Sequence, residues 1–167
     1  MMDIIRTEIT EQQIQKLFAE IEEDHFNDFK AKDISGRKMS KSVSAFANAS
    51  GGDIYIGIRE ESDTKIKHWE GFLCIEEANS FIQVVESLSE VAGFYNAEFL
   101  KHPVLNTYVL RLSIFKTKSI VKTTDEKIFV RKGAQNLPVD TPEKLRRLEL
   151  DKGISTYEDE TVANSIP

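Results

Sequence analysis

The chain has 167 residues, of which 40% are hydrophobic and 30% charged, a balance typical of a soluble globular domain and too apolar for a disordered chain. No apolar run approaches the roughly 18 residues of a membrane span, and the first residues lack the basic and apolar regions of a signal peptide. The single cysteine, Cys74, rules out an intrachain disulfide and fits a reducing compartment. We therefore expect a cytoplasmic protein with one domain, residues 1–150, and an acidic tail, residues 151–167.

The formal net charge is −6, but the charge is unevenly distributed along the chain. Residues 1–100 carry 10 basic and 19 acidic side chains, whereas residues 101–150 carry 11 basic and 5 acidic ones. The tail adds 1 basic and 4 acidic side chains. Phosphate binding depends on local basic density more than on the sum, so the overall acidity does not exclude a nucleic-acid surface on the C-terminal half.

The first half of the chain is predicted to form two helices and three strands. Thr10 and Gln13 form a capping box at the start of the first helix. Gly51 and Gly52 end the second helix, and the alternation that begins at Ile54 predicts a strand after it. In chain order, these elements are the helix 10–23, the strand 25–30, the helix 37–49, the strand 53–61 and a short strand 66–69.

The second half is predicted to contain further strands between two helices. Asp125 and Glu126 supply the turn of a hairpin, and Pro142 marks the first turn of the last helix. In chain order, these elements are the helix 75–92, the strands 97–101 and 107–115, a hairpin of 119–123 and 127–131, and the helix 141–150. This order predicts an α+β fold with a mixed, mostly antiparallel sheet and about four helices.

Three stretches of the sequence carry a family resemblance. Residues 23–30 read Glu-Asp-His-Phe-Asn-Asp-Phe-Lys, residues 45–52 read Ala-Phe-Ala-Asn-Ala-Ser-Gly-Gly, and residues 128–134 read Ile-Phe-Val-Arg-Lys-Gly-Ala. In this order, and with the last helix after them, they resemble domains of the Schlafen/AlbA type over about residues 20–150. The resemblance implies a fold like half of a Schlafen core, and DNA binding is the family's commonest assignment.

The same resemblance implies a role for Glu23, Asp28 and Glu60. Some Schlafen members are RNA endonucleases that use three carboxylates, two in the opening motif, where Asp28 replaces the usual Glu, and one after the Gly-Gly strand. By that resemblance the three residues would be catalytic and would bind Mg²⁺ or Mn²⁺, hard cations that take oxygen ligands and activate water. Glu61 is an alternative for the third position. The residues alone also allow a salt bridge, for example between Asp28 and a lysine, or merely solvated charges.

Candidate nucleic-acid contacts lie in two basic groups and at the glycine turn. The even spacing of Lys116, Lys118 and Lys122 predicts a basic stripe along one edge of the hairpin. Asn48, beside the glycines, either contacts a ligand or caps its helix. The full set of candidates is Lys30, Arg37, Lys38, Lys41, Asn48, Lys116, Lys118, Lys122, Arg131 and Lys132.

These patterns favour three functions. The first is a nucleic-acid-binding module for DNA or RNA that contacts backbone phosphates without strong base readout; Tyr55, Trp69, Phe94 and Tyr95 are interpreted as core or interface residues and not as stacking surfaces. The second is a metal-dependent endoribonuclease in which Lys30 or Arg131 steadies the scissile phosphate. The third is a non-catalytic subunit that forms a homo-oligomer or binds a partner protein. None of them involves a membrane.

Overall fold

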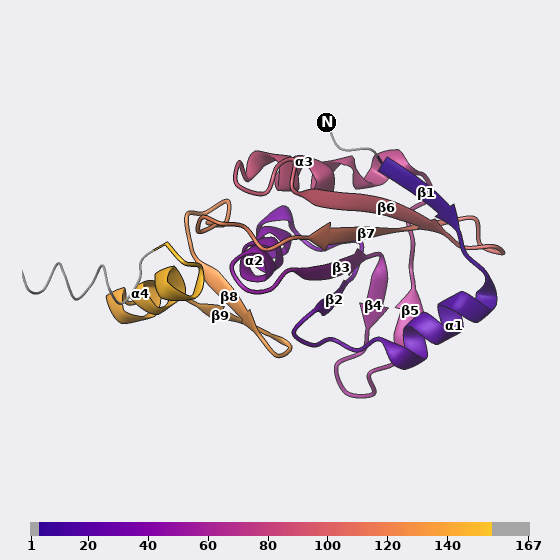
Figure 1. Cartoon of the computed structure of the whole chain (residues 1–167). Coiled ribbons are helices and arrows are strands. Elements are labelled where there is room, and N and C mark those ends of the chain that lie inside the picture. The colour runs from indigo at the N-terminus through magenta and orange to yellow at the C-terminus, as the bar shows by residue number, and fades with distance from the viewer. Residues whose placement is uncertain (1–3, 155–167) are drawn as a thin grey trace, which may run out of the picture.

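A computed structural model describes residues 4–154 of the chain (Figure 1). Three helices begin at a side chain that accepts a hydrogen bond from a free backbone N–H group, namely at Thr10, Ser35 and Thr141. The reciprocal bonds of Thr10 with Gln13 form the predicted capping box. The elements in chain order are β1 (Ile4–Glu8), α1 (Glu11–Glu20), β2 (Asn27–Lys30), α2 (Gly36–Ala47), β3 (Gly52–Ile56), β4 (Ile58–Glu60), β5 (Lys67–Trp69), the short 3-10 helix η1 (Ile75–Ala78), α3 (Asn79–Ser87), β6 (Tyr95–Lys101), β7 (Tyr108–Ile114), β8 (Phe129–Lys132), β9 (Gln135–Pro138) and α4 (Pro142–Asp151).

A mixed five-stranded sheet lies at the centre of the fold, with the strand order β1-β6-β7-β3-β2. The pairs β6–β7 and β3–β7 are antiparallel, whereas both edge strands pair in parallel, β1 with β6 and β2 with β3. Two small antiparallel sheets, β4–β5 and β8–β9, complete the fold. The predicted α+β class with a mixed sheet is therefore confirmed.

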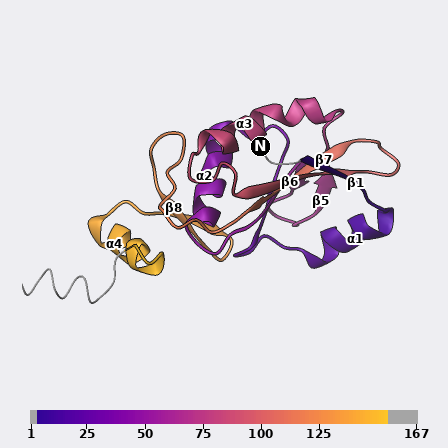
Figure 2. The same ribbon diagram turned by 45° about the horizontal axis from the view of Figure 1, so that its top comes forward.

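The two faces of the central sheet are covered by different elements (Figures 1 and 2). On one face, Phe46 of α2 and Val85 of α3 pack into a buried cluster with strand residues such as Leu112. On the other face, Ile14 of α1 lies in a second cluster with Phe29 of β2. Burial of apolar side chains on both faces supplies the main stabilisation of such a three-layer arrangement. No helix among residues 4–154 combines the length and the apolarity that crossing a bilayer requires.

The strand predicted at 53–61 is broken at Gly57. This residue has a φ of +109°, a conformation that favours glycine, and its carbonyl accepts hydrogen bonds from the N–H groups of Glu70 (2.8 Å) and Gly71 (3.0 Å). The break places β3 in the central sheet and β4 in the small sheet with β5. An uninterrupted strand would place Glu60 on the same sheet face as Ile54. Because of the break, Glu60 lies in a different sheet from Ile54.

The predicted hairpin of 119–123 and 127–131 was wrong in its pairing. A turn does form at its tip, where Thr123 N–H donates to the Lys127 carbonyl at 2.7 Å. Within the described residues, however, the two predicted strands pair only through an isolated β-bridge between Lys122 and Ile128. β8 pairs instead with β9 across a turn at Gly133, whose φ is +55°. The expected basic stripe along a hairpin edge is consequently absent from the described part of the chain.

Two further predictions needed correction. β1 was not predicted, because the run Ile-Ile-Arg-Thr-Glu shows no alternation; it is an exposed edge strand held by pairing with β6. The helix predicted at 75–92 begins with η1 and ends at Ser87, since Leu88 adopts an extended backbone. The other predicted elements are confirmed to within a few residues at each end. Residues 155–167 of the predicted tail lie outside the described residues.

The Gly51–Gly52 turn between α2 and β3 generates a prediction about stability. Gly51 has a φ of +80°, and a Cβ there would lie 2.6 Å from the carbonyl oxygen of Ile114. Gly93 has a similar φ of +83°, but a Cβ there would meet nothing within 4 Å. We expect Gly51→Ala to lower the free energy of unfolding by about 1–3 kcal/mol more than Gly93→Ala, because only the first adds a backbone clash to the strained φ. Equal losses in urea denaturation would contradict this account of the turn.

Candidate nucleic-acid interface

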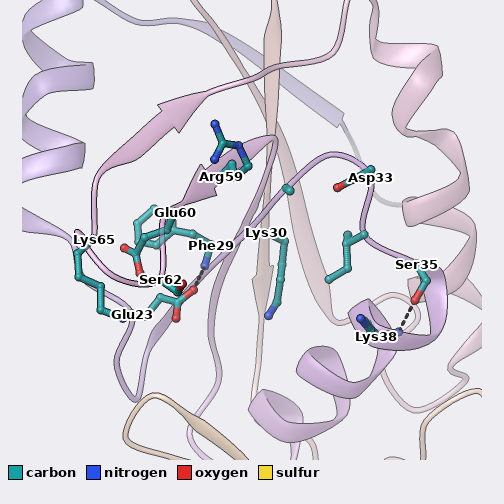
Figure 3. Close-up of a pocket in the computed structure, with 12 residues that line it drawn as sticks. Glu23, Phe29, Lys30, Asp33, Ser35, Lys38, Arg59, Glu60, Ser62 and Lys65 are labelled. Atoms are coloured by element: carbon teal, nitrogen blue, oxygen red, sulfur yellow. Dashed lines mark hydrogen bonds between the residues drawn. The ribbon is translucent and has the colours of Figure 1, made fainter.

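An open cavity of about 610 Å³ lies where the end of β2, the first turn of α2, β4 and the β4–β5 turn meet (Figure 3). Its lining combines basic and acidic side chains with the apolar ring of Phe29. The residues that line it are Glu23, Phe29, Lys30, Ala31, Asp33, Ile34, Ser35, Lys38, Arg59, Glu60, Ser62 and Lys65.

Four basic side chains from four segments surround this cavity, and they differ in their ion pairs. Lys30 Nζ lies 3.3 Å from Asp28 Oδ2, and Arg59 Nε lies 3.7 Å from Glu70 Oε2. Lys38 and Lys65 are exposed and have no ion pair among the described residues. Figure 3 shows Lys65 and Lys38 at opposite sides of the cavity with Lys30 between them. Such a spread of positive charge fits an extended anion.

Of the three carboxylates that line the cavity, Glu60 and Glu23 are engaged with other groups, whereas Asp33 is exposed and has no ion pair among the described residues. Glu60 Oε2 lies 3.5 Å from Lys67 Nζ, and both side chains are mostly buried. Glu23 accepts a hydrogen bond from Phe29 N–H at 3.3 Å. Burial raises the pKa of the Glu23 carboxyl, and the neighbouring Asp28 raises it further. The negative charge that these groups present to a ligand is therefore reduced.

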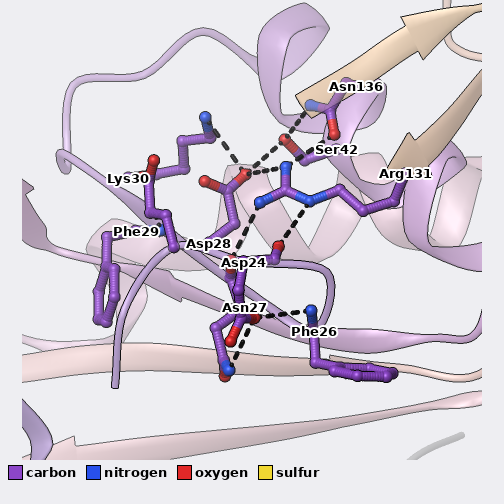
Figure 4. Close-up of polar contacts among 10 residues, drawn as sticks. Asp24, Phe26, Asn27, Asp28, Phe29, Lys30, Ser42, Arg131 and Asn136 are labelled. Atoms are coloured by element: carbon purple, nitrogen blue, oxygen red, sulfur yellow. Dashed lines mark hydrogen bonds and ion pairs between the residues drawn. The ribbon is translucent and has the colours of Figure 1, made fainter. Parts of the chain in front are cut away.

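A buried ion pair lies behind the cavity and fixes the position of Asp28 (Figure 4). Asp28 is 1% exposed and Arg131 is 2% exposed. Arg131 Nη1 lies 3.7 Å from Asp28 Oδ2, which also accepts a 2.9 Å hydrogen bond from Ser42 Oγ. A buried carboxylate requires a partner. The salt bridge of Asp28 with a lysine, which the sequence allowed, forms with Lys30. Arg131 is a second basic partner of the same carboxylate.

Arg131 makes several further contacts that leave it unavailable to a ligand. Its Nε donates to the carbonyl of Asp24 (3.0 Å), its Nη2 to the carbonyl of Asn27 (3.0 Å), and its Nη1 to Asn136 Oδ1 (2.8 Å). Its guanidinium also lies over the ring of Phe46, 4.7 Å from the centroid. The prediction that Arg131 contacts nucleic acid is therefore corrected: the residue is an internal tie between segments.

Two of the predicted metal ligands, Glu23 and Glu60, line the cavity, and Asp28 lies beside Glu23. Asp28 and Glu60 each carry a basic partner, and within residues 4–154 no three His, Cys, Asp or Glu side chains form a group that could hold a metal ion. Glu61, the alternative third ligand, is paired with His68 at 2.9 Å. Catalysis by Glu23, Asp28 and Glu60 with Mg²⁺ or Mn²⁺ stays a prediction without a contact that supports it.

Asn48 caps and braces the C-terminal end of α2. Its Nδ2 donates to the carbonyls of Val121 (2.9 Å) and Phe129 (2.9 Å), and its Oδ1 accepts from Val121 N–H (2.8 Å). The side chain is buried and its polar atoms are hydrogen-bonded within the chain. Of the two alternatives for Asn48, the structure therefore favours the helix cap over the contact with a ligand.

The remaining predicted basic residues are dispersed over the surface. Lys41 lies over the ring of Phe129, 4.7 Å from its centroid, and Arg37 is exposed in the first turn of α2. The others line separate hollows: Lys116 and Lys118 share one, Lys122 lines a second and Lys132 a third. Of the ten candidates, the structure thus brings only Lys30 and Lys38 together at the cavity.

Sequence reasoning missed Arg59 and Lys65. Arg59 falls within the strand predicted at 53–61, and it lies on β4, which begins after the break at Gly57. Lys65 lies in the β4–β5 turn with a φ of +61°, which no sequence signal at this lysine indicates. Among the aromatic residues, Tyr55 and Tyr95 are buried as predicted, whereas Phe94 is 65% exposed.

Comparisons with known proteins agree with this fold. A family model described as Schlafen, AlbA_2 matches residues 23–140, and the chain therefore belongs to this family. At a coarse level, membership supports a nucleic-acid-binding domain. A crystal structure of the DIP2311 protein from Corynebacterium diphtheriae is similar, with a TM-score of 0.52 and 18% identity over 83% of this chain, which spans 31% of that protein. No curated protein matches the chain.

The buried pair predicts a large effect of Arg131 on stability. Arg131→Gln leaves Asp28 buried with a single charged partner, Lys30, whose side chain is 26% exposed, so we expect a loss of about 3–5 kcal/mol in the free energy of unfolding. The neighbouring Lys132 is exposed, and Lys132→Gln is expected to change stability by less than about 0.5 kcal/mol. Urea denaturation of both variants measures the contrast, and a small loss for Arg131→Gln would show that the pair does not hold β8 in place.

The raised pKa of Glu23 predicts a pH dependence of stability. The folded chain holds this proton more tightly than the unfolded chain, so the group costs stability as the pH rises from about 4.5 through the raised pKa. Glu23→Gln keeps an acceptor for Phe29 N–H but removes the charge. We expect the variant to lose less stability than the wild type across this interval, as measured by urea midpoints at several pH values. The exposed neighbour provides the control, Glu22→Gln; identical pH profiles for Glu23→Gln and the wild type would refute the assignment.

Proposed function

We propose that this chain binds nucleic acid through its backbone phosphates at the cavity between β2, α2 and β4. The observation that carries the proposal is the convergence of Lys30, Lys38, Arg59 and Lys65 on one open cavity. Two of these cations have no carboxylate partner among the described residues and are available to a phosphate. Lysine and arginine contacts with phosphates supply most of the non-specific affinity of nucleic-acid-binding proteins.

The N-terminal end of α2 supports the same function. Ser35 caps this helix by accepting a hydrogen bond from Lys38 N–H at 3.2 Å, and both residues line the cavity. The first turn of a helix carries backbone N–H groups without intrahelical partners and a partial positive charge. A phosphate beside Lys38 therefore gains from the helix end as well as from the side chain.

The charge pairing behind the cavity explains how an acidic chain supports an anion site. Asp28 is neutralised by Arg131 and Lys30, and Glu60 by Lys67. Because these pairs are buried or half-buried, solvent screens them less than it screens surface pairs. Asp28 and Glu60 consequently repel a phosphate less than free carboxylates would, whereas Lys38 and Lys65 have no carboxylate partner among the described residues.

Removal of the two unpaired lysines tests the proposal. We expect Lys38→Gln/Lys65→Gln to weaken the binding of labelled tRNA and duplex DNA and to reduce the slope of log K against log salt by nearly one unit per lost phosphate contact. Fluorescence anisotropy at several salt concentrations measures both quantities.

The control variant changes two exposed lysines outside the cavity, Lys16→Gln/Lys144→Gln, and so alters the net charge equally. If both double variants lose affinity to the same extent, the cavity is not the binding site. Parallel incubations with Mn²⁺ and with EDTA distinguish the other functions. Metal-dependent cleavage would favour the endoribonuclease, and a chain that neither retains nor cleaves nucleic acid would favour the oligomerising or partner-binding subunit.

A further inference from the structure

A second hollow, of about 450 Å³, lies at the opposite end of α2 from the cavity. Thr117 lines it and joins it to this helix, because its N–H and its Oγ1 donate to the carbonyl of Ala47 at 3.1 and 3.3 Å. The hollow also contains Phe94, which precedes β6, and Phe115, which follows β7.

Both phenylalanines expose much of their rings to solvent, 65% for Phe94 and 47% for Phe115. The antiparallel register pairs Tyr95 with Ile114, so Phe94 and Phe115 are the next residues outward at the ends of these neighbouring strands. Neither ring contacts another aromatic ring within residues 4–154. Two aromatic surfaces are thus available in one hollow.

The same hollow is positively charged. Lys116 and Lys118 line it and have no ion pair among the described residues. Lys152 lies beside it, with Nζ donating to Thr117 Oγ1 at 3.1 Å. Burial lowers the pKa of Lys152 to about 8, and the charge of Lys116 contributes to the shift. Glu90 is the acidic residue of the lining, so the cations outnumber it.

We propose that this hollow binds one unstacked nucleotide of a single-stranded nucleic acid, whose base stacks on Phe94 or Phe115 while its phosphate contacts Lys116 and Lys118. Exposed aromatic rings beside lysines are the combination with which proteins hold single strands, because every base has a face that stacks. This inference rests on the proposed function and deepens it, since it assigns the single-stranded form as the preferred ligand.

The position of the hollow suits a ligand that also reaches the first cavity. The two sites lie at the two ends of α2, whose 12 residues correspond to about 18 Å at 1.5 Å per residue. Because α2 is buried between Met39 and Ala47 apart from the half-buried Lys41, a single strand that reaches both sites would cross the elements that cover this helix. It would contact Lys38 at one end and the phenylalanines at the other. A regular duplex keeps its bases stacked inside the helix and offers none to the phenylalanines.

Phenylalanine variants and an abasic oligonucleotide test the stacking directly. We expect at least one of Phe94→Ala and Phe115→Ala to lower the affinity for a 12-nucleotide oligo(dT) by about 5- to 150-fold, which corresponds to the loss of one base stack, with an unchanged salt slope. Neither variant should alter the affinity for an abasic oligonucleotide of equal length or for duplex DNA. Lys116→Gln/Lys118→Gln should instead lower the salt slope for both single strands. Phe26→Ala, which truncates a phenylalanine that is 53% exposed outside the hollow, is the matched control.

Each outcome separates this inference from the proposed function. Equal binding of oligo(dT) by the Phe94, Phe115 and wild-type proteins would overturn the stacking site, and it would leave the first cavity intact if Lys38→Gln/Lys65→Gln still weakens binding. A change in self-association on light scattering, without a change in affinity, would make the hollow a protein interface and overturn the inference. A wild type that binds no nucleic acid would overturn the proposed function as well. Thermal melting of each variant shows that the affinities compare folded proteins.

Discussion

The buried ion pair between Asp28 and Arg131 connects parts of the chain that are far apart in sequence. Asp28 lies on the edge strand β2, and Arg131 comes from β8, in a different sheet. The guanidinium also bonds the carbonyls of Asp24 and Asn27 and packs on Phe46 of α2. A charge pair so enclosed is costly to break. It therefore fixes the C-terminal β8–β9 sheet against residues 23–30, and this sheet covers one side of α2.

This arrangement determines what the cavity can do. Asp28 is held by Arg131, Lys30 and Ser42. Its carboxylate, in the motif of residues 23–30, is therefore neutralised by these partners and is not a free ligand. Lys38 and Lys65 line the cavity without an ion pair among residues 4–154, as does the exposed Asp33. The family fold is thus compatible with phosphate binding in a chain whose net charge is −6, because local pairing matters more than the sum.

The sequence was sufficient to predict the fold class and most elements, because their signals are local. Examples are the capping box at Thr10, the helical spacing of apolar residues in α2 and the glycine at position 51, where the backbone is left-handed. It was insufficient where a distant contact decides. Gly57 divides an alternating isoleucine run because its carbonyl accepts bonds from Glu70 and Gly71. Arg131 and Asn48 resemble surface ligands in sequence, yet contacts with residues 73 to 107 positions away bury them. The cavity itself assembles from four segments, so of its basic residues only Lys30 and Lys38 were found in advance, together with the carboxylates Glu23 and Glu60.

The most direct test of the account is an amide chemical-shift titration of the whole chain with a short single-stranded oligonucleotide. We predict that the largest shifts fall at the first turn of α2, on Gly36, Arg37 and Lys38, and at Lys65 in the β4–β5 turn, and that they diminish as salt is added. Shifts confined to α1, or a saturated complex that leaves the α2 N-terminus unperturbed, would contradict the account.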